Sequence, residues 1–309
     1  MKLPWLPPGH LRILPGRGEV FYRHHINPDS TGPTLLLLHG WTASADTQFF
    51  TAYEELAESY SYIAVDHRGH GRGMRAAFTL VDAADDAAML VRELGLGPVV
   101  CVGYSMGGPV SMLLASRHPD LVAGIVLEAT ALEWRGTLLE RLTWRGLTVM
   151  GMWLRSRWYL HWLRTGLRRL GRIHEDLEQW FPWLEGEIRR NDVHGMIEAG
   201  RELAKYDARP FATSLGKPTG MLLTTKDRLV RPRKQHALAA ALAAHVVELP
   251  GDHLCSLVQP SLFSSATRRL VDDVVSRLPA PAGPGLTVSG DSSSTFTASR
   301  STEAARPLR

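Results

Sequence analysis

Short apolar runs recur along the chain, and stretches with helical periodicity separate most of them. Runs of this kind, with few polar interruptions, are typical of strands that are buried on both faces of a parallel sheet. They predict strands at residues 34–38, 62–65, 99–102, 122–127, 219–225 and 246–249. Residues 11–14 and 19–24 predict a further pair of strands, an antiparallel hairpin around the turn at residues 15–18.

The segments between these runs predict helices. In residues 80–94 the apolar positions fall on one face, and acidic residues, Asp86 among them, are expected to point outward. The predicted helices span residues 48–59, 80–94, 107–117, 234–244 and 261–277. Because strand and helix alternate, the sequence predicts an α/β fold with a doubly wound, mostly parallel sheet.

The alternation stops between residues 132 and 205, which carry a helical pattern and seven of the nine tryptophans. We interpret this segment as an inserted helical cap on a core formed by residues 1–131 and 206–278. Residues 279–309 are rich in Pro, Gly, Ser and Thr and show no apolar periodicity. This composition predicts a disordered tail.

The formal net charge of +4 raises the question of nucleic-acid binding. Residues 133–172 hold nine arginines against two glutamates, whereas residues 175–198 hold seven acidic residues against two arginines. Two neighbouring segments of opposite charge favour mutual compensation over a phosphate-binding groove. No nucleic-acid partner is therefore expected, and weak contact of the basic cap with a membrane surface remains a hypothesis.

The two cysteines, Cys101 and Cys255, are too few for a disulfide framework and favour a reducing compartment. Residues 1–16 lack the continuous apolar stretch of a secretory signal, so a cytoplasmic location is expected. The glycine-rich loop at residues 66–73 does not have the spacing of a phosphate-binding loop. No metal or cofactor is expected.

The strongest candidate for chemistry is Ser105, in the sequence Gly103-Tyr104-Ser105-Met106-Gly107-Gly108. This G-x-S-x-G motif follows a predicted strand and precedes a predicted helix, the context in which a serine sits on a sharp, strained turn. Small residues at Gly103 and Gly107 are needed where a Cβ would collide with neighbouring backbone. The alternative is a glycine-rich turn with an incidental serine.

A serine hydroxyl becomes a nucleophile when a histidine takes its proton and a carboxylate orients that histidine. Asp227 follows the predicted strand at 219–225, and His253 follows the one at 246–249. Both therefore fall at the carboxyl edge of the sheet, where open α/β sheets bind ligands. Glu128 follows another strand and is the alternative acid.

The negative charge that develops on the substrate also needs backbone N–H donors. The N–H groups of Met106, at the start of a helix, and of Trp41 are the candidates for this oxyanion hole. Gly40 leaves the loop free to turn toward the serine. We interpret His39 as a residue that orients this loop through hydrogen bonds and transfers no proton.

Taken together, His39-Gly40-Trp41, Asp66-His67-Arg68-Gly69-His70-Gly71, the Ser105 motif, Asp227 and Gly251-Asp252-His253 resemble the α/β-hydrolase fold superfamily, in its cap-bearing esterase and lipase-like branch. The resemblance spans roughly residues 10 to 277. It implies a Ser105–Asp227–His253 triad and an acyl-enzyme. Haloalkane dehalogenases and soluble epoxide hydrolases of this superfamily use aspartate at the nucleophile position, which Ser105 disfavours.

The substrate is less constrained than the triad. Tyr104, Trp153, Trp158 and Trp162 are candidates for the substrate pocket, and an aromatic cap favours a small lipophilic carboxylic ester. The tryptophans alternatively only pack the cap on the core. Thioesterase, carbon–carbon bond hydrolase and perhydrolase activities use the same triad, and a non-catalytic binding module of this fold is the remaining alternative. The sequence leaves the oligomeric state open.

Overall fold

The computed structural model describes residues 3–135, 146, 165–166 and 175–279. Its contacts divide the chain into two units, Met1–Leu278 and Pro279–Arg309. Of the predicted tail at 279–309, all but residue 279 lies outside the described residues, and so does most of 136–174 in the predicted cap. The cap therefore stays a prediction.

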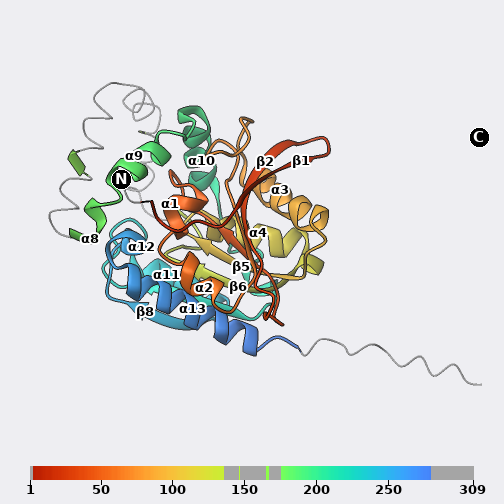
Figure 1. Ribbon diagram of the computed structural model, residues 1–309. Helices are drawn as coiled ribbons and strands as arrows, with labels where there is room; N and C mark the ends of the chain where they lie inside the picture. The colour runs from red at the N-terminus through yellow and green to blue at the C-terminus, as the bar shows by residue number, and fades with distance from the viewer. Residues whose placement is uncertain (1–2, 136–145, 147–164, 167–174, 280–309) are drawn as a thin grey trace, which may run out of the picture. The chain divides into compact units, whose positions relative to one another are not determined.

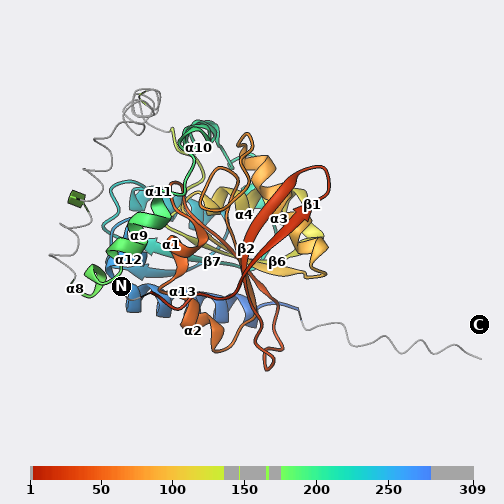
Figure 2. The ribbon, with the colours of Figure 1, turned by 45° about the horizontal axis from the view of Figure 1, so that its top comes forward.

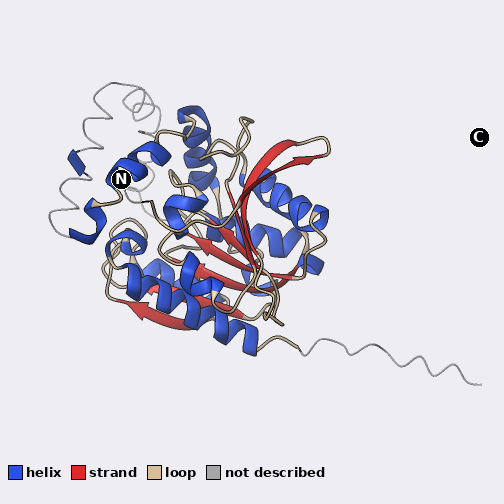
Figure 3. Cartoon of the chain, in the orientation of Figure 1, coloured by secondary structure: helices blue, strands red, loops and turns tan. Residues whose placement is uncertain are grey.

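Eight strands form one sheet in the order β1-β2-β4-β3-β5-β6-β7-β8 within the described residues (Figure 3). The six strands β3 to β8 run parallel, and β1 and β2 form an antiparallel hairpin at one edge. This confirms the predicted fold class. The strands are β1 Gly9–Leu14, β2 Gly18–His25, β3 Leu35–Leu38, β4 Tyr62–Val65, β5 Val99–Tyr104, β6 Val122–Glu128, β7 Thr219–Thr224 and β8 His245–Leu249.

The side chains of β3 show why the strand is apolar throughout. Leu36 and Leu38 pack into the core on one face of the sheet, and Leu35 and Leu37 pack into the core on the other. All four are fully buried. Since burying one such side chain contributes about 2 kcal/mol, a polar residue on either face would destabilise the sheet.

Helices cover both faces of the sheet (Figures 1 and 2). One core contains side chains of α3, α4, α10 and α11, and the other contains side chains of α1, α2, α9 and α13. The α-helices are α1 Ala45–Phe49, α2 Tyr53–Ala57, α3 Leu80–Glu93, α4 Gly107–Arg117, α8 Glu175–Glu178, α9 Phe181–Ile188, α10 Val193–Lys205, α11 Pro232–Ala241, α12 Cys255–Val258 and α13 Pro260–Ser276. Two 3-10 turns, η1 Pro119–Leu121 and η2 Ala212–Ser214, complete the described elements.

The prediction of one helix over residues 48–59 is wrong, because two short helices, α1 and α2, occupy this region. Ser44 caps α1, which begins three residues before the predicted start, and the Ser44 hydroxyl accepts a hydrogen bond from the Thr47 N–H. Thr51, between the two helices, donates its hydroxyl to the Ser256 carbonyl, 205 residues away. A contact of such long range is not visible in local periodicity.

The outward orientation expected for Asp86 is also wrong. Its side chain is buried and accepts two hydrogen bonds, at 2.7 and 2.9 Å, from the Arg68 guanidinium. Arg17 of the β1–β2 turn pairs with the same carboxylate. A carboxylate can be buried when it is paired in this way, and both partners lie outside the helix that carries it.

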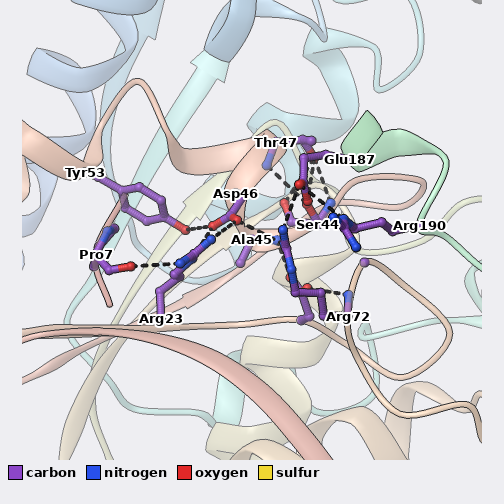
Figure 4. Close-up of polar contacts among 12 residues, drawn as sticks. Pro7, Arg23, Ser44, Ala45, Asp46, Thr47, Tyr53, Arg72, Glu187 and Arg190 are labelled. Carbon is purple, nitrogen blue, oxygen red and sulfur yellow. Dashed lines mark hydrogen bonds and ion pairs between the residues drawn. The ribbon is translucent and has the colours of Figure 1, made fainter. Parts of the chain in front are cut away.

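A second buried carboxylate links the N-terminal segments to α9 (Figure 4). Asp46 of α1 lies 2.7 Å from an Arg23 nitrogen of β2 and 3.2 Å from an Arg72 nitrogen. Arg72 also reaches Glu187 of α9, at 2.7 Å. These ion pairs fix α9 beside α1, and the two helices pack against each other.

None of the helices in the described part of the chain is long and apolar enough to span a bilayer.

Candidate active site

Ser105 lies on a sharp turn between β5 and α4, and its backbone is in the left-handed region with φ of 51°. This conformation is strained for a residue with a side chain. A Cβ on Gly103 would overlap the carbonyl oxygen of Gly107, and a Cβ on Gly107 would overlap that of Leu38. The two glycines are therefore needed for the close approach of α4 to β3 and β5.

Hydrogen bonds hold this turn on both sides. The Ser105 N–H donates to the Glu128 carbonyl at 2.8 Å, and the Thr130 hydroxyl donates to the Ser105 carbonyl at 2.7 Å. A Cβ on Gly108 would lie 2.5 Å from the Thr130 hydroxyl. The surrounding structure thus imposes the strained conformation of the serine.

Replacing Gly107 by alanine is expected to lower the free energy of unfolding by about 3 kcal/mol or more, because backbone of β3 occupies the position of the new methyl group. Urea unfolding measures the change. Gly186→Ala is the matched control, since Gly186 lies in α9 with open space around it and should gain up to about 1 kcal/mol. Equal stability of the two variants would contradict the steric explanation.

Ser105, His253 and Asp227 come together at the carboxyl ends of β5, β8 and β7. The Ser105 hydroxyl lies 3.0 Å from His253 Nε2, and His253 Nδ1 lies 2.7 Å from an Asp227 carboxylate oxygen. Ser105 is 5% exposed and the Asp227 side chain is fully buried. The three side chains form a continuous line of hydrogen-bonding groups.

Further donors hold the Asp227 carboxylate in place. One oxygen accepts the N–H groups of Leu229 and Val230, both at 2.8 Å, and the other accepts the Thr224 hydroxyl at 2.9 Å. The Gln235 side chain in turn donates to Thr224 Oγ1, at 2.8 Å. These donors fix the orientation of the carboxylate toward His253.

Glu128, the alternative acid, is the last residue of β6 and is fully buried. One of its carboxyl oxygens accepts the Thr267 hydroxyl of α13 at 2.5 Å, and the other has no hydrogen-bond partner within the described chain. Burial raises the pKa of this carboxyl to about 8. His253 Nδ1 donates its hydrogen bond to Asp227, whereas Glu128 faces α13.

The two candidate oxyanion donors flank Ser105. Met106 follows the serine and precedes the first residue of α4. Gly40 lies so close that a Cβ there would be 3.3 Å from Ser105 Cβ, which places the Gly40–Trp41 backbone beside the serine. The Trp41 indole N–H donates to the Met196 carbonyl of α10 at 2.7 Å and anchors the side chain of this loop residue.

His39 is buried under the same loop. Its Nδ1 lies 2.8 Å from the Gly40 carbonyl, and its Nε2 accepts the His67 N–H at 3.0 Å. Burial, followed by the neighbouring His67 and His70, holds the pKa of His39 well below its usual value. The ring is therefore neutral near pH 7, and both of its nitrogens bind loop backbone.

A cavity of about 580 Å³ opens beside Ser105 and His253. Its described lining is mostly apolar and comes from the loop after β3, from α9 and α10 and from the loops after β7 and β8. Apolar lining residues include Trp41, Ala131, Trp134, Leu184, Ile188, Leu203, Leu229, Leu254 and Leu257. A concave, apolar site with a few polar groups is typical of small-molecule binding.

Of the four residues predicted to line the substrate pocket, one lies in the described structure. Tyr104 lines the cavity, although its hydroxyl donates to the His253 carbonyl at 3.0 Å and so supports the histidine loop. Trp153, Trp158 and Trp162 lie outside the described residues. Three cations of the lining, Arg228, Arg231 and Lys234, were not predicted. The only signal for them in the sequence is their position, because all three follow the candidate catalytic acid Asp227 within seven residues.

The described residues contain no group of three or more His, Cys, Asp or Glu side chains that is suited to hold a metal ion. The buried histidines of the loops, His39, His67 and His70, pack ring against ring. Burial lowers the pKa of His67 to about 3 and that of His70 to about 4.

Comparison with known proteins identifies the family of this chain and several relatives. The model of a family described as alpha/beta hydrolase fold matches residues 33–260. The chain is 35% identical over 104 residues to a 2-(acetamidomethylene)succinate hydrolase from Mesorhizobium japonicum, a match that covers 33% of this chain and only 37% of that relative. It is 29% identical over 259 residues to a pimeloyl-[acyl-carrier protein] methyl ester esterase from Xanthomonas oryzae pv. oryzae, covering 81% of this chain and 99% of that one.

A solved structure shows the same fold. The enol-lactonase from Burkholderia xenovorans LB400 superimposes with a TM-score of 0.73 at 20% sequence identity. The match covers 85% of this chain and all of the lactonase. At this level of identity the likeness concerns the fold alone.

Proposed function

This chain belongs to the α/β-hydrolase fold family, and we propose that it is a serine hydrolase that cleaves a lipophilic carboxylic ester through an acyl-enzyme. The observation that carries the proposal is the line from Ser105 through His253 to Asp227, with distances of 3.0 and 2.7 Å. The mostly apolar cavity beside it supports the choice of a lipophilic substrate. In this proposal Ser105 is the nucleophile, His253 the general base and Asp227 the orienting acid.

In the first half of the reaction, His253 Nε2 takes the hydroxyl proton while Ser105 Oγ forms a bond to the ester carbon. The carbonyl oxygen becomes negative and accepts the backbone N–H groups of Trp41 and Met106. Asp227 stabilises the imidazolium through His253 Nδ1. The ester bond then breaks, and the alcohol leaves with the proton from Nε2.

In the second half, a water molecule replaces the alcohol. His253 takes a proton from this water, which attacks the acyl-enzyme, and the bond to Ser105 Oγ breaks as the oxygen regains its proton. The acid is released and the free enzyme is restored. Each proton passes through the same imidazole nitrogen, which is why a fixed orientation of the ring is needed.

The names of the relatives favour this bond type without fixing the substrate. The relative that matches over most of both chains is named for the hydrolysis of a methyl ester. The relative of higher identity is named as a hydrolase of a succinate derivative and matches over a third of this chain. We therefore propose a small-molecule ester as the substrate.

A panel of p-nitrophenyl esters of increasing acyl length tests the proposal. We expect kcat/KM to rise by at most roughly fourfold per added methylene until the cavity is filled, because each buried methylene contributes about 0.8 kcal/mol. Acyl thioesters and ring-fission dienones belong in the same panel. Turnover of one of these with no turnover of any ester would contradict ester hydrolysis and favour that chemistry on the same triad.

A further inference from the structure

One wall of the cavity beside Ser105 is positively charged. Among its described lining residues are Arg228, Arg231 and Lys234, and no aspartate or glutamate is among them. All three cations come from the loop after β7 and the start of α11. The described lining is therefore apolar over most of its surface and cationic along one side.

Neighbouring acids do not neutralise the two arginines. Lys234 lies 3.1 Å from a carboxylate oxygen of Glu133, but neither the Arg228 guanidinium nor the Arg231 guanidinium forms a hydrogen bond or ion pair with any described residue. Asp227, adjacent in the sequence, directs its two oxygens to His253, to Thr224 and to backbone N–H groups. Both guanidiniums are exposed and open to a ligand.

The position of the arginines does not favour the helix that they precede. Arg231 is the N-cap residue of α11, its side chain makes no capping hydrogen bond, and the first turn contains no acidic residue. The amino end of a helix carries partial positive charge, so cations there destabilise it and anions stabilise it. A bound anion would relieve this repulsion, whereas a purely structural role does not explain it.

We propose that Arg228 and Arg231 bind a carboxylate of the substrate. The substrate is then an ester that carries a free carboxylate away from the scissile bond, with an apolar part between the two groups. Guanidinium groups suit this task because their planar N–H groups match a carboxylate. The inference rests on the proposed ester hydrolysis, and it adds a specificity-determining pair to that site.

Matched substrates test the proposal. Monoethyl suberate and 4-(butyryloxy)benzoate carry the carboxylate in the acyl part and in the leaving group, respectively. Ethyl octanoate and the methyl ester of 4-(butyryloxy)benzoic acid are their neutral counterparts. We expect the wild type to have a higher kcat/KM for at least one anionic ester than for its neutral counterpart, and the preferred pair shows which side faces the arginines. Added salt should reduce this preference.

The ratio of kcat/KM between the anionic ester and its neutral counterpart is the readout for variants. Because both guanidiniums are exposed, we expect Arg228→Gln or Arg231→Gln to lower the ratio by roughly threefold to tenfold, and the double variant by at least about tenfold. Arg→Lys at each position should retain part of the preference. The control is Arg233→Gln with Arg269→Gln, which removes two exposed charges outside the cavity lining and should leave the ratio within about twofold.

The possible failures are distinguishable. Equal losses for anionic and neutral esters, or an equal effect of the control variant, would overturn the role of the arginine pair while ester hydrolysis stands. A wild type that prefers neutral esters at low salt would overturn it as well. A folded wild type that hydrolyses no ester of either kind would instead contradict the proposed function, on which this inference rests.

Discussion

Ser105→Ala is expected to lower kcat for ester hydrolysis by at least about 10⁴-fold and to abolish labelling by a fluorophosphonate probe. The variant removes the oxygen that lies 3.0 Å from His253 Nε2, so no atom remains to form the acyl-enzyme. Alanine also relieves no collision, because the strain at this position lies in the backbone, with φ of 51°. The fold should therefore persist, and circular dichroism together with urea unfolding measures this.

A second serine of the same cavity provides the control. Ser256 lines the cavity and accepts a hydrogen bond from the Gln48 side chain at 3.0 Å, but no histidine lies within hydrogen-bond distance of it in the described structure. Ser256→Ala should still be labelled. Loss of the label in this variant alone would transfer the nucleophile to residue 256. A folded wild type that takes up no label would favour a non-catalytic binding module of this fold.

Asp227→Asn is expected to lower kcat by about 10³- to 10⁴-fold. An amide has an N–H group that competes with His253 Nδ1–H, so the ring loses the tautomer that leaves Nε2 free to take the serine proton. The substitution also removes the counter-charge of the imidazolium, because an Asp227 carboxylate oxygen lies 2.7 Å from His253 Nδ1. A single-turnover assay of acyl-enzyme formation measures the loss directly.

Glu128→Gln is the matched comparison for this substitution. Because burial raises the Glu128 pKa to about 8, the carboxyl is mostly protonated at pH 7, and an uncharged glutamine of the same shape replaces it closely. We expect a loss of less than about tenfold. If Glu128→Gln were the more damaging of the two changes, the role of the acid would pass to Glu128.

The strands and most of the helices could be predicted because they depend on local pattern. The strands begin and end within two residues of the predicted bounds, since runs such as Leu35–Leu38 are apolar on both faces of the sheet. The wrong predictions concern residues whose positions depend on tertiary contacts. Asp86 was predicted to face solvent because a charge on a helix normally does, and its partners Arg17 and Arg68 lie in loops outside that helix.

Ser105, Asp227 and His253 each follow a predicted strand, and this position alone predicts that they lie at one edge of the sheet. That edge follows from parallel strands, whose carboxyl ends must meet. The cavity wall could not be predicted in the same way. Leu184 and Leu203 reach the cavity from α9 and α10, and their positions depend on contacts such as the Arg72–Glu187 ion pair. Periodicity alone cannot specify such contacts.

The strand order also determines when activity can arise during protein synthesis. The ribosome releases the chain from its amino end, so β5 with Ser105 emerges long before β7 and β8, the strands that precede Asp227 and His253. On the proposed roles, a nascent chain that has assembled only up to β6 carries a strained but unassisted serine. Hydrolysis then begins only after β8, the last strand, has joined the edge of the sheet.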